Sequence, residues 1–116
     1  MNSANAKSFL EFVIDLRNEV SRHLPIGNSL IMFDLIFRIS ISHQKNQDLS
    51  IKQLFTELPH SEMGMRYHFR RLEKRGWIQI IQQDGDRRSR FIIPTEKLIK
   101  QVEALTEEII KRCILI

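Results

Sequence analysis

SEMGMRYHFRRLEKRG, residues 61–76, is the stretch that decides the fold of this chain. Ser61 can cap the first turn of a helix, and Gly76 can end that helix in the left-handed conformation. The stretch therefore predicts a helix over residues 61–75. At 100° per residue, Met65, Phe69 and Leu72 fall on one face, which we expect to pack on the rest of the protein.

The opposite face of this predicted helix is basic. Residues 61–90 hold eight Arg and Lys against four Asp and Glu, whereas the other 86 residues carry ten of each sign. The whole net charge of +4 therefore lies in one quarter of the chain. Such clustering is the electrostatic footprint of a nucleic-acid binder, although charge alone also fits a solvated helix face.

The segments on either side supply the neighbours of this helix. Ser50 and Gln53 have the spacing of a capping box at the start of a short preceding helix. Trp77–Gln82 and Arg90–Ile93 are rich in Ile and aromatic residues and flank a polar tip, residues 83–89, which predicts a β-hairpin. Two short helices, a tight turn and a hairpin make a winged helix-turn-helix, whose second helix enters the DNA major groove.

Three longer helices are expected outside this region. Residues 5–23 carry a wide apolar stripe, and residues 29–42 are nearly all apolar, with Asp34 and Arg38 spaced to pair with each other. Thr95 is expected to cap the last helix, over residues 95–116. Its apolar positions repeat at helical spacing: Leu98, Val102, Leu105 and Ile109.

At 116 residues and 42% hydrophobic content, the chain fits one domain, residues 1–116. We expect a mainly α fold with a small β-hairpin wing, in which residues 49–94 form the winged helix-turn-helix. The helices of residues 5–42 and 95–116 would form a dimerisation region, because their apolar stripes would otherwise leave hydrophobic surface exposed on a monomer.

The recognition helix 61–75 supplies most of the predicted DNA contacts. Its N-terminal half faces base edges, where Gly64 would allow close approach, Arg66 would fork onto guanine and Tyr67 would touch a thymine methyl or a phosphate. The side chains further along would contact phosphates. The predicted DNA-binding residues of the helix are Ser61, Met63, Gly64, Arg66, Tyr67, Arg70, Arg71 and Lys74.

The hairpin tip supplies a second predicted contact. Arg87, Arg88 and Arg90 lie on or beside a protruding wing, residues 83–90, which can reach a neighbouring minor groove or its phosphates. Asp86 is expected to stabilise the wing by holding an arginine through a charge-assisted hydrogen bond. A solvated, charged loop is the alternative interpretation of the same residues.

Residues 49–97 resemble the MarR (multiple antibiotic resistance regulator) family of bacterial winged-helix transcription factors. The similar segments are LSIKQL at 49–54, FRRLEKRGWI at 69–78 and GDRRSRFIIPTEK at 85–97. The resemblance implies a cytoplasmic, nucleoid-associated homodimer that binds a pseudo-palindromic double-stranded operator, as a repressor or less often an activator. Many members respond to phenolic ligands or to cysteine oxidation, which leaves a small-molecule inducer open here.

Two other binding functions fit the same pattern. A winged-helix module could bind a protein partner through its apolar terminal helices, in which case Arg66 and Arg88 would be dispensable. An RNA-binding winged helix is disfavoured, because the single Tyr67 gives almost no aromatic platform for unstacked bases.

An enzyme is not predicted, because the sequence has no Gly-rich phosphate loop, paired-His motif or nucleophile beside a plausible base. No cofactor or metal is expected, since no two of His23, His43, His60 and His68 have the spacing of a helical metal pair. Cys113, the only cysteine, is interpreted as a buried small hydrophobe. No secretory signal or membrane span is recognised, so the protein is expected in the cytoplasm.

Overall fold

The computed structural model describes residues 3–82 and 90–114 of the chain. Along these ranges the elements are α1 (Ser3–His23), α2 (Leu30–Gln44), α3 (Ile51–Glu57), α4 (Glu62–Lys74), β1 (Ile78–Gln82), β2 (Arg90–Pro94) and α5 (Glu96–Ile114). The expected α fold with a β-hairpin is confirmed, and most element ends lie within two residues of their predicted positions.

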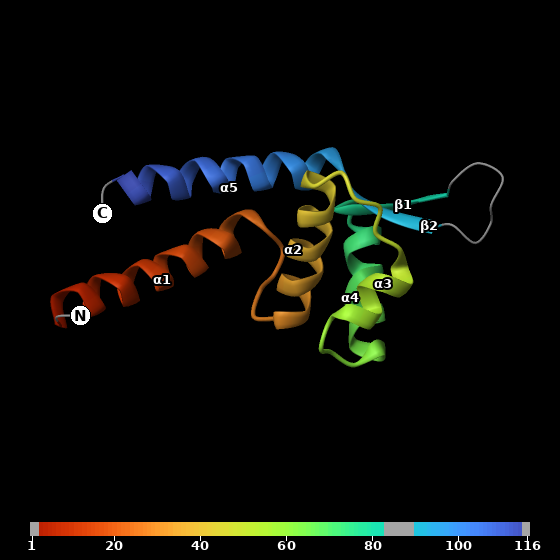
Figure 1. The fold of residues 1–116 in the computed structure, drawn as a ribbon, viewed down its shortest axis with the longest axis horizontal. Helices are drawn as coiled ribbons and strands as arrows, with labels where there is room; N and C mark the ends of the chain where they lie inside the picture. Colours follow the sequence, from red (N-terminus) through yellow and green to blue (C-terminus); the bar gives the residue numbers. More distant parts are fainter. Residues whose placement is uncertain (1–2, 83–89, 115–116) are drawn as a thin grey trace.

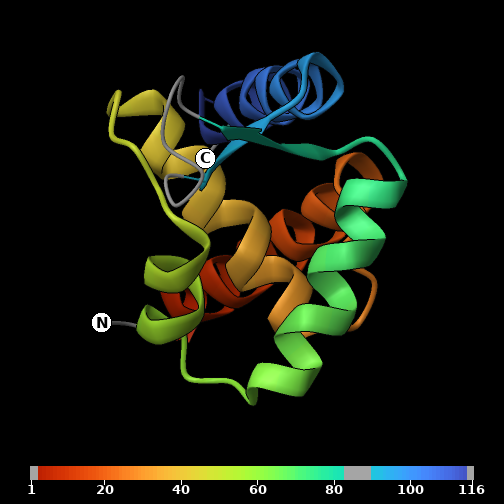
Figure 2. The ribbon, with the colours of Figure 1, turned by 90° about the vertical axis from the view of Figure 1, so that its right-hand side faces the viewer.

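Helix α2 forms the centre of the core. Leu35, Ile36 and Ile39 are at most 1% exposed, as expected for a nearly all-apolar helix. Figure 2 shows α3 and α4 on either side of α2, with the hairpin and α5 across one end. The apolar face predicted for α4 is confirmed, because Met65, Phe69 and Leu72 are all buried.

The hairpin is antiparallel and closes on the segment before α3. Ile78 pairs with Pro94 at one end of the ladder, and Gln82 pairs with Arg90 at the other. The backbone N–H of Ile92 donates to the carbonyl oxygen of Leu49 at 2.9 Å. This bond ties the wing to the start of the helix-turn-helix.

Helices α1 and α5 extend away from the hairpin on the same side of the molecule, where both chain ends lie (Figure 1). Glu19 of α1 is only 3% exposed, and its carboxylate accepts a hydrogen bond from Arg112 of α5 at 2.7 Å. A buried carboxylate needs such charged partners, so this pair fixes α1 against α5. Within residues 3–82 and 90–114, no helix is long and apolar enough to cross a membrane.

The predicted pairing of Asp34 with Arg38 is wrong. Asp34 instead meets the His60 Nε2 at 2.6 Å, and Arg38 donates to the Glu57 carboxylate at 2.7 Å. Because α3 and its following turn pack beside α2, Asp34 and Arg38 each find a partner on another segment, and Arg38 also donates to the Ser42 Oγ one turn along its own helix.

The predicted capping role of Thr95 is also corrected. Its hydroxyl donates to the carbonyl oxygen of Gly76 at 2.6 Å and lies 3.1 Å from that of Trp77. The side chain therefore ties the end of the hairpin to the turn after α4.

Candidate nucleic-acid interface

Local capping bonds set the limits of the helix-turn-helix. The N–H of Gln53 donates to the Ser50 Oγ at 3.0 Å, while the Ser50 N–H donates to the Gln53 Oε1 at 2.9 Å, which confirms the capping box of α3. Ser61 Oγ accepts from the Gly64 N–H at 3.2 Å and caps α4. Gly76 ends the segment at φ 79°, in the left-handed region predicted for it.

The turn between α3 and α4 is anchored to the core helix. The His60–Asp34 contact is made by a His side chain that is only 17% exposed and an Asp side chain that is 33% exposed. At the end of α3, Glu57 pairs with Arg38 of the same core helix. These two contacts hold both ends of the turn against α2, so α4 has a defined orientation.

The outer face of α4 is exposed, as the sequence predicted. Met63 is 83% and Tyr67 is 58% exposed, and Arg71 is half-buried among the exposed cations of the face. Six side chains line one shallow hollow along the helix: Met63, Arg66, Tyr67, Arg70, Arg71 and Lys74. The structure thus brings six of the eight predicted helix residues together on one surface, which we call the outer face of α4.

Two arginines of the outer face of α4 are held by neighbours on their own helix. Arg66 donates to the Glu62 carboxylate from Nη2 at 2.7 Å and from Nε at 3.1 Å. The guanidinium of Arg71 lies 5.5 Å from the centre of the Tyr67 ring, and its Nη1 donates to the Tyr67 hydroxyl at 3.3 Å. Both contacts reduce the number of conformations that the guanidinium groups explore before they bind anything.

Ser61 and Gly64 have structural roles at the start of α4. The Ser61 oxygen is occupied by the cap, and a Cβ at Gly64 would lie 3.0 Å from the Ile31 Cδ1 and 3.0 Å from the Ser61 Oγ. Gly64 therefore lets α4 pack closely on α2. Contact of either residue with DNA stays a prediction.

His68 is a titratable group on the flank of α4. Burial, and to a smaller extent the nearby Arg71 charge, lower the pKa of His68 below its usual range. Its Nδ1 is buried and has no hydrogen-bond partner among the described residues. A proton added there would be unsatisfied, so the ring is neutral near pH 7.

The wing is described only in part. Arg90 begins β2 and is exposed, opposite Gln82 in the ladder. Arg87, Arg88 and Asp86 lie outside the described residues, so their predicted contacts stay predictions.

Sequence reasoning missed two residues that shape this region. Glu62 was counted only as a charge, although its position four residues before Arg66 is the spacing of a helical ion pair. Lys97 lies with its Nζ 4.2 Å from the centre of the Trp77 ring and donates to the carbonyl oxygen of Arg75 at 3.2 Å. Lys97 thus ties α5 to the end of α4, a contact between distant segments for which the sequence gives no signal.

An apolar groove lies between α1, α2 and α5, away from the outer face of α4. Its volume is about 520 Å³. Its apolar lining consists of Val13, Leu16, Val20, Ile26, Phe33, Phe37, Leu105, Ile109 and Ile110. We call this surface the apolar groove.

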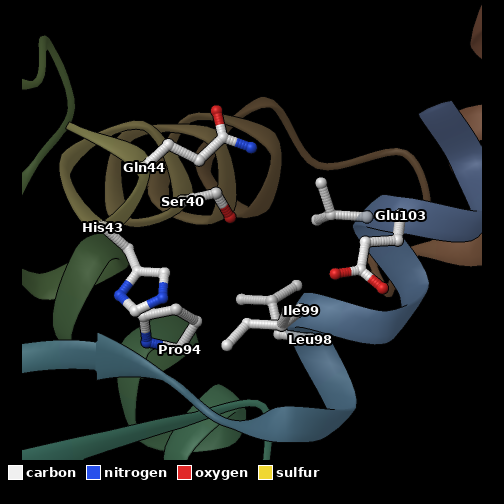
Figure 3. Close-up of a pocket in the computed structure, with 8 residues that line it drawn as sticks. Ser40, His43, Gln44, Pro94, Leu98, Ile99 and Glu103 are labelled. Carbon is white, nitrogen blue, oxygen red and sulfur yellow. The ribbon is translucent and has the colours of Figure 1, made fainter. Parts of the chain in front are cut away.

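A smaller hollow of about 140 Å³ lies between the end of α2, Pro94 and the first turns of α5 (Figure 3). The Ser40 hydroxyl points into it and has no hydrogen-bond partner among the described residues, with His43 and Glu103 at the rim. Across residues 3–82 and 90–114, no three His, Cys, Asp or Glu side chains gather as a metal site would require.

Comparison with known proteins identifies the fold. No protein-family model and no curated relative matches the sequence. Three solved structures superpose on nearly the whole chain. MepR from S. aureus bound to ethidium bromide has a TM-score of 0.68 at 16% identity, over 99% of this chain and 79% of its own. NadR in complex with 4-hydroxyphenylacetate has a TM-score of 0.63 at 18% identity, over 98% and 76%.

A MarR-like transcription regulator from Bacillus cereus gives a TM-score of 0.51 at 16% identity, over 94% of this chain and 78% of its own. At these identities the likeness is one of fold. The winged-helix fold of MarR-like regulators, expected from the resemblance of residues 49–97, is confirmed.

Proposed function

We propose that this chain is a sequence-specific regulator of transcription that binds double-stranded DNA as a homodimer and represses its target. The observation that carries the proposal is the outer face of α4. Four of its side chains, Arg66, Arg70, Arg71 and Lys74, are cationic, and the opposite face of the same helix is buried. A rigidly anchored helix with a basic outer face can enter the major groove.

The two halves of α4 have different predicted tasks. Met63, Arg66 and Tyr67 lie nearer the N-terminal end, where a recognition helix meets base edges. Arg70, Arg71 and Lys74 follow and would neutralise phosphates, which adds affinity without sequence information. Arg90, together with the predicted Arg87 and Arg88, would extend the contact to the flanking minor groove.

Exposed apolar surface supports the homodimer. Leu10 of α1 is 63% exposed, Ile14 is 50% exposed and Ile110 of α5 is 54% exposed. These side chains lie on two of the helices that border the apolar groove, and a monomer would leave them in water. A second copy that covers this surface would place two α4 helices in successive major grooves, about one helical turn apart.

The same surface favours the alternative function, a module that binds another protein and no specific DNA. The two functions differ in what α4 does. If the protein uses only the apolar groove to bind a partner, replacing Arg66 leaves that binding intact. If α4 reads DNA, replacing Arg66 weakens the binding of DNA.

The proposed function includes a response to a small-molecule inducer, whose chemical class is left open. Two of the matched structures hold an organic ligand, 4-hydroxyphenylacetate in NadR and ethidium in MepR. No described residue of this chain fixes the chemistry of such a ligand.

Fluorescence anisotropy tests the proposed function. The purified protein is titrated into a labelled duplex from the region upstream of its own gene and into a scrambled duplex, at two salt concentrations. A preference for the upstream duplex that survives the higher salt supports the regulator. Weak and equal binding that disappears with salt contradicts it, and then the protein-binding module is the better account.

A further inference from the structure

Glu62 lies at the end of α4 that the proposed function sends into the groove, and its charge has the wrong sign for DNA. Its side chain is 66% exposed, beside an Arg66 side chain that is 56% exposed. A carboxylate there repels the phosphates on both sides of the groove, so it lowers affinity for every sequence unless a base supplies a donor.

The contact between Glu62 and Arg66 leaves both groups able to bind further. Oε1 of Glu62 accepts from the Nε and Nη2 of Arg66, along one edge of the guanidinium. The guanidinium also lies 6.0 Å from the centre of the Phe55 ring on α3. Among the described residues, only Glu62 bonds to the two terminal nitrogens of Arg66, and the edge that these nitrogens form has the spacing of guanine O6 and N7.

The second carboxylate oxygen of Glu62 also matches one particular group on the bases. Among the described residues, no donor bonds to its Oε2. In the major groove the hydrogen-bond donors are the amino groups of cytosine and adenine. A carboxylate, which only accepts, matches the N4 amino group of cytosine, whereas adenine is matched by an amide that both donates and accepts.

We propose that Glu62 is a specificity-determining residue that reads cytosine next to the guanine read by Arg66. The inference rests on the proposed function. Glu62 and Arg66 act as one preformed unit: Arg66 binds guanine through its open edge, and Glu62 holds that edge in place while its second oxygen accepts from the neighbouring cytosine amino group.

The helix dipole offers a purely structural reason for an acidic residue at this position. A carboxylate in the first turn stabilises a helix through its attraction to the positive end of the dipole. That role changes the melting temperature but has no effect on which base pairs are preferred. Base preference therefore separates the two roles.

The test is selection of duplexes from a random pool by the full-length protein, followed by sequencing. The wild type is compared with Glu62→Gln and with Glu73→Gln, a matched control. Glu73 is exposed near the other end of the same helix. Both variants replace one carboxylate by a neutral amide, so they change the net charge equally. Their melting temperatures are measured alongside.

We expect the wild type to select a motif in which cytosine lies beside guanine, and Glu73→Gln to select the same motif. Glu62→Gln should keep the guanine but lose the preference for cytosine by about tenfold, with adenine gained, since an amide pairs with adenine. An unchanged motif for Glu62→Gln overturns the inference and leaves the proposed function intact. A wild type that selects no motif overturns both.

Discussion

Replacing Leu10 by glutamate should separate the proposed dimer without unfolding the subunit. Leu10 lies on α1 and is 63% exposed, so the isolated fold loses little from the change. Full burial of a leucine contributes about 1.5–3 kcal/mol, and covering the exposed part in a dimer therefore contributes about 1.5 kcal/mol per copy. Because a two-fold interface contains the position twice, Leu10→Glu should weaken association by about 3 kcal/mol, or roughly a hundredfold in Kd.

Sedimentation velocity over a range of protein concentrations measures this effect. Ser8→Glu is the matched control, because Ser8 is exposed on the polar side of the same helix and the variant adds the same charge. The control should sediment as the wild type does, while Leu10→Glu should dissociate into folded monomers at roughly a hundredfold higher protein concentration than the wild type. Identical profiles for both variants would refute the assignment of α1 to the interface.

Three further results are expected from single substitutions. Arg66→Ala should weaken binding to the selected duplex more than to random duplex, whereas Arg71→Ala should weaken both alike and reduce the slope of log affinity against log salt by about one per subunit. Identical behaviour of the two variants in anisotropy titrations would contradict the division of α4 into base-reading and phosphate-binding halves. Gly76→Ala should lower the free energy of unfolding by about 1–2 kcal/mol, because φ is 79° there, and an unchanged melting temperature would argue against this. The pKa of His68 is lowered in the folded protein, whereas in the unfolded chain this histidine titrates at its ordinary pKa of about 6.5. The unfolded chain therefore binds more protons below that pH, and the free energy of unfolding should fall as pH drops through about 6.5. Urea unfolding at pH 7.5 and 5.5 measures this fall in the free energy of unfolding, which should be smaller in His68→Gln. An equal fall in the wild type and the variant would show that other groups cause it.

Features set by neighbours in sequence were predicted correctly. The capping box of Ser50 and Gln53 and the left-handed Gly76 depend on backbone groups within a few residues, so the residue types determine them. The buried face of α4 follows in the same way from helical periodicity. These local signals were enough to place the outer face of α4.

Contacts between distant segments could not be predicted in this way. Asp34 and Arg38 have ideal spacing for each other, yet tertiary packing gives each a different partner. Glu19 is a charged residue in the middle of α1, yet it is buried, because Arg112, 93 residues away, reaches its carboxylate. Periodicity describes one helix at a time, so it contains no information about which side chains meet across helices.

Chemical interference at guanine N7 tests most directly whether α4 reads the major groove. Duplexes carrying the selected motif are methylated sparingly with dimethyl sulfate, and bound and unbound fractions are compared. The N7 of guanine lies in the major groove and is one of the two acceptors assigned to Arg66. We expect methylation to interfere at two clusters of guanines about 10 base pairs apart, and Arg66→Ala to lose this sensitivity. Binding that is indifferent to N7 methylation would contradict the placement of α4 in the major groove.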